Sequence, residues 1–483
     1  MGHLVSKGID LMHRQLRSWS GILLVLASSH ASFGADWSRF RGPNGSGVSQ
    51  DQASTPVTWS QTQNIKWKVD LPGPGSSSPI VVGDKVFVTC WTGYALERGT
   101  RAGEQSNLKR HLICFDRQTG NVAWDRSVDP YLPEEGYSGM FAENGYATHT
   151  PVSDGERVYV FFGKTGVLAF DLNGKQLWQT TVGTGSDSMG WGSASSPILY
   201  KNLVIVTASP ESKAMYGLDK STGKEVWKQE ADGFSGTWGT PVLIDSDEGR
   251  TDLVVGVPYE IWGFNPETGN IRWFCEALNV RSFCSSVVTD GKLIYAMGDQ
   301  GSGSIAIKPG GKDDVTKSHV VWIGKDNNRI GSPVIADGKI YFVNNRVLSC
   351  SDTKTGTRIF QGRLGTGSSA EVQDDAGQDS PRDRGARGGR GTGGRNGGGG
   401  QDYSSPVIAD GKIYFVTRSG DMHVVKVADT FEPLATNRVT DEAEDFSATP
   451  AIKDGALFIR SSKRLYCIAE TPASSTPEKP RRD

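Results

Sequence analysis

The stretch Leu218-Asp219-Lys220-Ser221-Thr222-Gly223-Lys224-Glu225-Val226-Trp227 decides the fold, because close variants of it recur along the chain. An Asp that bonds back to the backbone, followed by a Gly that accepts positive φ, favours a tight hairpin turn. The Trp then lies on the strand after the turn. Further copies are Phe115-Asp116…Gly120…Trp124, Phe264-Asn265…Gly269…Trp273, the shorter Asp171…Gly174…Trp178, and Ser351-Asp352…Gly356…Phe360, which replaces the Trp.

A second phrase recurs eight times and gives the period. Each copy has a small residue, usually followed by Pro, then a short apolar run, an Asp-Gly or Gly-Asp turn and an alternating apolar strand. The small residue stands at Ser78, Thr150, Ser196, Thr240, Ser286, Ser332, Ser405 and Thr449. Five of the seven spacings between copies are 44–46 residues and two are 72 and 73, so two copies carry insertions. This period suits a four-stranded propeller blade.

The two ends of the repeat region complement each other. The eighth copy stops after Leu465-Tyr466-Cys467-Ile468 without a fourth strand, and an orphan strand, Asn64-Ile65-Lys66-Trp67-Lys68-Val69, precedes the first copy. Closing the ring with this strand pairs two edges that an open array would expose. We therefore expect an all-β fold, an eight-bladed β-propeller of four-stranded blades over residues 64–470, closed by an N-terminal strand.

The repeated Asp-x-x-Thr-Gly-x-x-x-Trp phrase resembles the PQQ-like repeat family, which includes BamB-type outer-membrane assembly propellers and quinoprotein dehydrogenases. The leader Trp37-Ser38-Arg39-Phe40-Arg41-Gly42-Pro43, within residues 36–63, is similar to a segment found before the propeller in exported members. The resemblance implies that the Trp residues dock one blade onto the next. It is specific for fold and weak for activity, because propellers support unrelated functions.

Residues 1–35 have the features of an export signal. His13, Arg14 and Arg17 precede the short apolar core 22–27, and small residues follow it. A buried N-terminal helix is the alternative. No later segment is apolar enough to span a membrane, so we expect a periplasmic or secreted protein and, with it, an oxidising environment. Of the six cysteines, Cys275 and Cys284 make the most plausible disulfide, whereas Cys114, Cys350 and Cys467 occupy one strand slot and suit buried positions.

Three insertions, at residues 91–111, 128–147 and 365–403, fall in connections that open on one face of a propeller. Clustered insertions mark a binding face, although drift in solvent loops is the alternative. Residues just before each innermost strand should ring the channel mouth on that face. The candidates for ligand or partner binding are Tyr146, His149, Trp191, Trp238, Arg281, Arg329, Asp402, Tyr403, Asp445 and Phe446.

Two other segments are too polar to form a core. The Gly/Arg-rich insertion, residues 367–402, and the tail, residues 471–483, should be disordered. Arg-Gly runs occur in nucleic-acid-binding proteins, but export and a net charge of −2 argue against that partner. We interpret the insertion as a solvated loop or as a basic tether for anionic surface partners.

For function, the leading hypothesis is an exported, non-catalytic and monomeric scaffold that binds an envelope protein or polymer through its loop-rich channel face. The alternative is a PQQ- or metal-dependent oxidoreductase of alcohols or sugars, and a small-ligand sensor is a third possibility. Quinoprotein dehydrogenases hold PQQ beneath two adjacent, disulfide-bonded cysteines and beside Ca²⁺. The sequence has no such Cys-Cys pair. Asn144, Asp402 and Asp445 could imitate the Ca²⁺ ligands, but no motif singles them out. We therefore expect no cofactor and no metal.

Overall fold

A computed structural model describes residues 35–96, 101–365 and 401–470 of the chain. The predicted signal peptide, apart from Ala35, and the tail lie outside these residues, as does nearly all of the Gly/Arg-rich insertion. Among the described residues, no helix is long and apolar enough to cross a membrane. The helices are single turns: α1 (Phe141–Asn144), α2 (Ser209–Ser212), α3 (Thr316–His319), η1 (Pro43–Gly45), η2 (Gln105–Asn107), η3 (Gly163–Thr165) and η4 (Asp232–Phe234).

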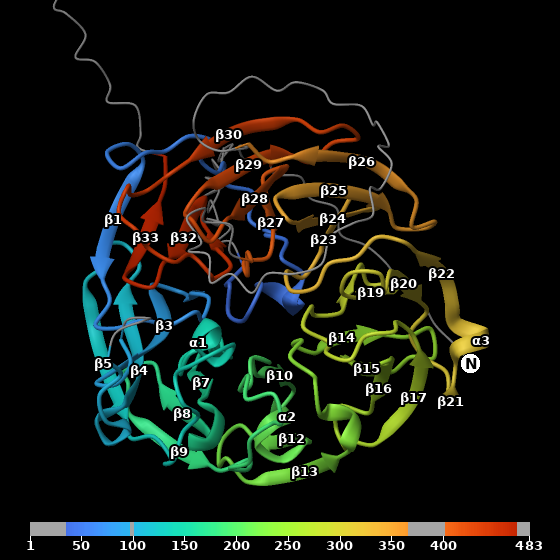
Figure 1. Cartoon of the computed structure of the whole chain (residues 1–483), viewed down its shortest axis with the longest axis horizontal. Coiled ribbons are helices and arrows are strands. Elements are labelled where there is room, and N and C mark those ends of the chain that lie inside the picture. Colours follow the sequence, from blue (N-terminus) through green and yellow to red (C-terminus); the bar gives the residue numbers. More distant parts are fainter. Residues whose placement is uncertain (1–34, 97–100, 366–400, 471–483) are drawn as a thin grey trace, which may run out of the picture. The chain divides into compact units, whose positions relative to one another are not determined.

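Eight sheets, each built on four antiparallel strands, surround a central axis, and in seven of them the strands follow chain order from the inside out, whereas the eighth ends on the N-terminal strand (Figure 1). Blades 1 to 4 are β2 (Ile80–Val82), β3 (Lys85–Thr92), β4 (Lys109–Asp116), β5 (Val122–Val128); β6 (Val152–Ser153), β7 (Arg157–Phe161), β8 (Val167–Asp171), β9 (Gln176–Thr180); β10 (Ile198–Tyr200), β11 (Leu203–Ala208), β12 (Ala214–Asp219), β13 (Glu225–Glu230); and β14 (Val242–Asp245), β15 (Thr251–Val257), β16 (Glu260–Phe264), β17 (Ile271–Glu276).

Blades 5 to 8 repeat this order. They are β18 (Val288–Thr289), β19 (Ile294–Met297), β20 (Ser304–Ile307), β22 (Val320–Gly324); β23 (Val334–Ala336), β24 (Lys339–Asn344), β25 (Val347–Asp352), β26 (Arg358–Arg363); β27 (Val407–Ala409), β28 (Lys412–Val416), β29 (Met422–Lys426), β30 (Pro433–Asn437); and β31 (Ala451–Lys453), β32 (Ala456–Arg460), β33 (Arg464–Ile468), β1 (Ile65–Asp70). The short β21 (Asp313–Asp314) adds a fifth, parallel strand to blade 4.

The eight-bladed prediction and its ring closure are confirmed. The N-terminal β1 pairs antiparallel with β33, from Ile65 opposite Ile468 to Asp70 opposite Arg464, and so supplies the outer strand of blade 8. In Figure 1 the blue β1 lies beside the red β33 at the point where the ring closes. Closure removes the free edge that β33 would otherwise expose.

The repeated Trp joins neighbouring blades, as the family resemblance implied. In five blades the indole N–H donates to a backbone carbonyl in the next blade's outer turn: Trp67 to Arg117, Trp124 to Leu172, Trp178 to Lys220, Trp227 to Pro266 and Trp322 to Thr353, at 2.8–3.2 Å. The rings cover Gly120, Gly174, Gly223, Gly269 and Gly356 of those turns. Between the blades, apolar faces form the core clusters.

One predicted disulfide is wrong, since all six cysteines are free. Cys275 belongs to β17 and is buried in the apolar cluster between blades 4 and 5, whereas Cys284 lines the central channel. The two side chains therefore face different parts of the fold, one the space between two blades and the other the channel. Cys114, Cys350 and Cys467 are buried within strands, as expected.

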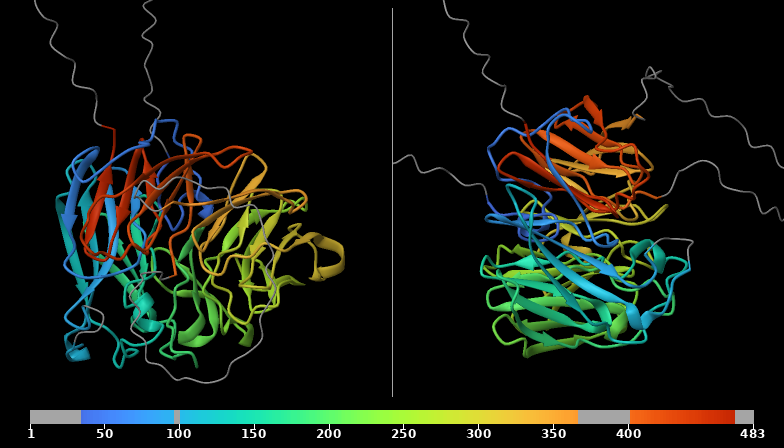
Figure 2. Two further views of the ribbon diagram at one scale, coloured as in Figure 1. Left: turned by 45° about the horizontal axis from the view of Figure 1, so that its top comes forward. Right: turned by 90° about the vertical axis from the view of Figure 1, so that its left-hand side faces the viewer.

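The leader lies across one end of the channel and bonds to the inner strands of several blades. Residues 37–49, which we call the channel plug, make backbone bonds to Val81 of β2, Ser153 of β6 and Ile408 of β27, and Asn44 donates to the carbonyl of Leu243 in β14 at 2.9 Å. Inner strands have an unpaired edge toward the axis, and the plug satisfies part of it. In Figure 1 part of the blue leader lies near the centre of the ring, and Figure 2 shows the same blades from two further sides.

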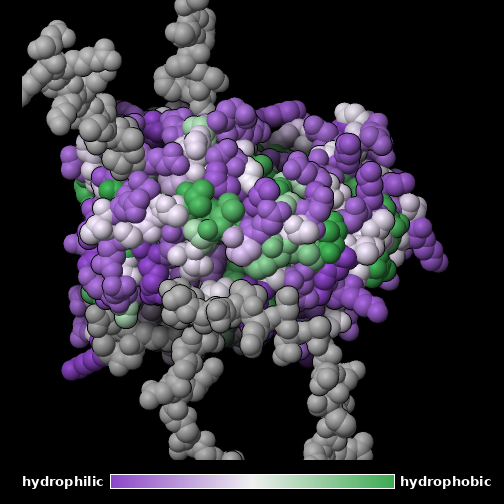
Figure 3. Space-filling view, turned by 90° about the horizontal axis from the view of Figure 1, so that it is seen from above, coloured by the Kyte–Doolittle hydropathy of each residue, from purple (hydrophilic) through white to green (hydrophobic). Residues whose placement is uncertain are grey.

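The rim seen in Figure 3 is mostly hydrophilic, with apolar side chains scattered among polar ones. Exposed Val122, Leu177, Val226, Ile271 and Ile359 each belong to an outermost strand. Such scattered apolar residues are normal on a soluble surface. These residues lie on the outer strands, away from the channel at the axis.

Candidate functional site

A closed belt of hydroxyl groups encircles the channel. It consists of the eight small residues that precede the inner strands, Ser78, Thr150, Ser196, Thr240, Ser286, Ser332, Ser405 and Thr449, and we call it the hydroxyl belt. The backbone N–H of each residue donates to the hydroxyl oxygen of the next one, at 2.9–3.1 Å, and Thr449 donates to Ser78 to complete the circle. The recurring Ser or Thr is thus the contact by which each blade binds its neighbour at the axis.

The belt surrounds a cavity at the centre of the ring. This cavity has a volume of about 140 Å³, and all eight belt residues line it. A second layer comes from the residues two positions earlier in each blade: Ser76, Thr148, Ala194, Trp238, Cys284, Ile330, Tyr403 and Ser447. Met140, Glu143, Asn144, Trp191 and Arg329 line the mouth, and Phe40 of the channel plug lines the opposite end.

Two tryptophans and an arginine form one side of the mouth. The rings of Trp191 and Trp238 lie 5.0 Å apart at an angle of 41°, and Arg329 places its guanidinium 5.9 Å from the Trp191 ring. The Trp238 indole N–H donates to the carbonyl of Gly192 at 2.7 Å, which fixes the pair. Aromatic faces beside a cation can stack on a planar group and pair with a negative one.

Arg418 contacts several residues on the other side of the channel mouth. It lies in the turn between β28 and β29, forms an ion pair with Glu143 of α1, and donates from Nε to Asp445 at 2.5 Å. Its guanidinium also lies 5.5 Å from the Tyr403 ring, and its backbone N–H donates to Asp402 at 2.8 Å. These contacts tie the insertion after blade 1 to blade 7, which is far away in sequence.

The insertion itself is held by an apolar cluster. Trp91, Tyr94 and Leu108 from the first inserted segment pack on Phe141 and Tyr146 from the second. Both insertions therefore lie on one face, as predicted, and α1 brings Met140, Glu143 and Asn144 to the cavity. The third insertion lies outside the described residues, except for residue 365 and residues 401–403.

Ten residues were predicted at the mouth, and four of them line the cavity: Trp191, Trp238, Arg329 and Tyr403. Asp402 and Asp445 lie nearby but bond to Arg418. Tyr146, His149 and Phe446 are buried behind the mouth, and Arg281 is exposed outside the cavity. Whether any of the ten binds a ligand stays a prediction.

There is a geometric reason why only four of the ten predicted residues line the cavity. Side chains of an extended segment alternate between two sides, so only belt positions and positions two residues earlier share the channel side. His149 directly precedes a belt residue and faces the other way. Sequence reasoning missed the belt's polar role, as well as Glu143 and Arg418. A search restricted to connections before inner strands could not find Arg418, which follows β28.

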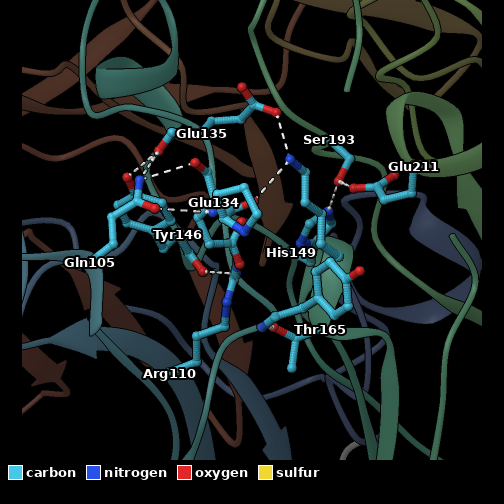
Figure 4. Close-up of polar contacts among 12 residues, drawn as sticks. Gln105, Arg110, Glu134, Glu135, Tyr146, His149, Thr165, Ser193 and Glu211 are labelled. Carbon is cyan, nitrogen blue, oxygen red and sulfur yellow. Dashed lines mark hydrogen bonds and ion pairs between the residues drawn. The ribbon is translucent and has the colours of Figure 1, made fainter. Parts of the chain in front are cut away.

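Behind the mouth, buried polar groups form a separate cluster (Figure 4). Arg110 pairs with Glu134, and both side chains are almost fully buried. His149 Nε2 lies 3.0 Å from Ser193 Oγ, which donates to Glu211 at 2.5 Å. Burial raises the pKa of Glu211 to about 7, and burial together with nearby Arg110 lowers the pKa of His149 to about 3.

This cluster surrounds a space of about 30 Å³, which is far smaller than the channel cavity. His149 and Glu211 share one serine hydroxyl, so they do not form the nucleophile–base–orienting-group chain of hydrolases. The cluster's visible role is to join blades 2 and 3 beneath the insertion. Within the described ranges no group of three or more His, Cys, Asp or Glu side chains could hold a metal ion.

Comparisons with known proteins agree with this architecture. A family model described as outer membrane protein assembly factor BamB matches residues 43–212 and 188–377. Two polyvinylalcohol dehydrogenases are similar in sequence. The one from a Sphingopyxis species is 23% identical over 259 residues, covering 44% of this chain and 35% of the relative. The one from a Pseudomonas species is 22% identical over 182 residues, covering 34% of this chain and 24% of the relative. The matches thus span about a third or less of these relatives.

Solved structures show the same fold at low identity. BamB from Moraxella catarrhalis matches with a TM-score of 0.56 and 11% identity, covering 85% of this chain and 99% of that protein. Quinohemoprotein alcohol dehydrogenase from Comamonas testosteroni matches with a TM-score of 0.57 and 12% identity, covering 92% and 82%. One fold thus carries both an assembly factor and redox enzymes.

Proposed function

Because the chain belongs to the family of PQQ-like repeat β-propellers described as outer membrane protein assembly factor BamB, we propose that it is a binding scaffold. Its channel mouth captures a polar segment of a partner protein or of an envelope polymer. The observation that carries this proposal is the channel cavity, where the Trp191–Trp238 pair and Arg329 stand above the hydroxyl belt.

The mouth combines the two kinds of contact that such a segment needs. Tryptophan faces supply apolar area at small entropic cost, and hydroxyl and guanidinium groups supply directional bonds. Among the described residues, the insertion that carries α1 adds a wall to one side of the mouth. A scaffold of this kind would act outside the cytoplasm, as the signal-like residues 1–35 suggest.

Site-specific cross-linking tests the proposal. A photo-reactive amino acid replaces Met140 at the mouth or, as the control, Asp337 in the turn after β23 at the opposite face. Illumination in an envelope extract should give a discrete adduct only from position 140. The double variant Trp191→Ala with Arg329→Ala should lose most of that adduct and keep its melting temperature. An adduct confined to position 337 would place the functional surface on the other face.

The similarity to polyvinylalcohol dehydrogenases favours a second candidate, an oxidoreductase of hydroxyl-bearing polymers. The channel residues do not fit PQQ with Ca²⁺ in the arrangement that the resemblance implies. Cys284 is the cysteine that lines the described cavity, the sequence has no adjacent Cys pair, and Glu143 is paired with Arg418. Adding PQQ, Ca²⁺ and polyvinyl alcohol should therefore produce no dye reduction. Reduction above a no-protein control would instead support the enzyme.

A further inference from the structure

Among the described residues, the hydroxyl belt has O–H groups that donate to no protein acceptor. Each belt hydroxyl already accepts an N–H from the preceding blade, but within the described part of the chain none of the eight donates its own O–H to a protein acceptor. Buried polar hydrogens are expected to find an acceptor. Eight O–H groups therefore converge on the channel cavity with their donor capacity unused.

Few negatively charged groups line the cavity wall and could accept hydrogen bonds from these donors. Among its lining residues Glu143 is the acidic one, and Arg418 pairs with it at the mouth. The other charged lining residue is Arg329, a cation. The described lining of the cavity is therefore rich in donors and has no unpaired carboxylate near the belt.

The channel plug adds positive charge directly beyond the belt. Arg39 donates to the carbonyl of Pro241 at 3.1 Å and Arg41 to that of Pro333 at 2.5 Å. These prolines directly follow the belt residues Thr240 and Ser332, and Phe40, which lies between the two arginines in sequence, lines the cavity. Both guanidinium groups thus lie one residue from the belt.

Neither arginine has an acidic partner among the described residues. Arg39 is 7% exposed and Arg41 is 1% exposed, and Nε of both, together with Nη1 of Arg41, has no hydrogen-bond partner. Burial lowers the pKa of Arg39 to about 10, and burial with the neighbouring Arg39 charge lowers that of Arg41 to about 9. Both remain charged at neutral pH, and two buried like charges without a counter-ion are unfavourable.

We propose that the channel cavity binds an oxyanion, held by hydroxyls of the belt and stabilised by the charges of Arg39 and Arg41. Resting on the proposed function, this names the group that a captured segment would insert, a carboxylate or phosphate. A volume of about 140 Å³ is several times what one water needs, which leaves room for such a group. Charge-assisted bonds from O–H to an oxyanion are among the strongest hydrogen bonds in proteins.

Adjacent serines provide a matched test. Ser286 and Ser405 belong to the belt, whereas their neighbours Ser285 and Ser404 are equally buried but do not line the cavity. Inorganic phosphate is titrated calorimetrically against sodium chloride of the same ionic strength. Ser286→Ala with Ser405→Ala should weaken phosphate binding by about tenfold or more, and Ser285→Ala with Ser404→Ala should leave it nearly unchanged. Equal binding by both double variants, or no binding by the intact protein, would overturn the proposal.

A measurement on the intact protein covers the case in which the belt variant fails to fold. Crystals grown in bromide should show an anomalous peak inside the belt or beside Nε of Arg41. Peaks confined to the outer surface would contradict the site. A peptide with a free C-terminal carboxylate should compete with phosphate better than its amide does, which distinguishes a chain end from a free ion.

The two proposals fail separately. If position 140 cross-links a partner but phosphate neither binds nor competes, the oxyanion site is wrong and the scaffold stands. If phosphate binds through the belt but position 140 captures nothing, the scaffold is wrong and the oxyanion site stands.

Discussion

Glu211 shows how one buried side chain can set the pH dependence of the whole ring. Its carboxyl group is buried beside Ser193, and its Oε2 atom has no hydrogen-bond partner. Burial favours the neutral acid and raises its pKa to about 7, whereas an unfolded chain has a Glu pKa of about 4.3. The folded state therefore binds a proton that the unfolded state releases between these two values.

The first prediction follows from that difference. Since the folded pKa is raised, the stability linked to Glu211 is present below about pH 4 and is lost as pH rises toward 7. Glu211→Gln should remove this loss, stabilising the protein at pH 8 by up to about 3 kcal/mol with little effect at pH 4.5. Denaturant unfolding of both proteins across this range measures it. The exposed Glu225→Gln is the control.

Comparing variant with intact protein also separates Glu211 from His149. Burial lowers the pKa of His149 to about 3, so its linked stability is lost as pH falls below about 6.5. That effect is common to both proteins and cancels in the difference. A Glu211→Gln protein with the same pH profile as the intact one would show that the carboxyl group is not buried as described.

At the scale of elements, the hairpin between the two outer strands carries the repeat. Gly269 has φ of +72°, and a Cβ built on it would lie 2.4 Å from the Trp227 ring of the preceding blade. Gly411, in the turn after β27, has a similar φ of +66° but nothing within 4 Å of such a Cβ. The first glycine serves a turn and a blade contact, and the second serves a turn alone.

The second prediction compares these two glycines. Both Gly→Ala variants should lose about 1 kcal/mol from the strained φ. Gly269→Ala should lose about 1–3 kcal/mol more, because the methyl group displaces the docked Trp227. Melting curves and denaturant unfolding of the two variants measure the difference. If both variants lose the same amount, the Trp would have no part in holding the blades together.

Three blades depart from the docking rule: the outer strands of blades 6 and 7 contain no Trp, and blade 4 has a Trp with a different acceptor. Trp273 of blade 4 donates to the side chain of Asp252 at 2.8 Å, and the same carboxylate accepts the N–H of Gly310 and pairs with Arg272. Blade 5 lacks the Asp-x-x-Thr-Gly turn and reaches its outer strand through β21 and α3. A buried carboxylate thus replaces the usual carbonyl acceptor where the repeat is broken.

At the scale of the whole molecule, the segment before blade 1 has two roles. Residues 37–49 bond to inner strands at one end of the channel, and β1 completes blade 8 and docks Trp67 on blade 1. The first role closes one end of the cavity, and the second closes the ring. Only the second removes a strand edge that could pair with another molecule.

The third prediction separates the two roles. Deleting residues 36–70 removes β1, so we expect aggregation or a large loss of stability. Deleting residues 36–63 retains β1, and this protein should stay monomeric and folded with a channel open at the far end. Size-exclusion chromatography and melting curves compare both with the intact chain. A protein without β1 that melts like the intact one would contradict closure through the N-terminal strand.

The repeat alone was enough to predict the blades, their number and the closing strand. Each blade buries the same local pattern of turn, alternating strand and Trp, so the period is visible without knowing any long-range contact. The four cavity residues among the predicted ten were found for the same reason, since all precede inner strands. Conversely, the Cys275–Cys284 disulfide was wrong because closeness in sequence does not show which surface a side chain faces.

Only the tertiary structure determined which side chains line the channel and which of them meet there. The hydroxyl belt exists because eight residues from eight blades meet on one axis, and a Ser-Pro or Thr-Pro pair in a single blade carries no sign of it. The Glu143–Arg418 pair joins residues 275 positions apart, and Arg39 reaches a carbonyl 202 positions away. Local patterns determine strands and turns, whereas side chains that meet across a closed ring are neighbours only after every blade is in place.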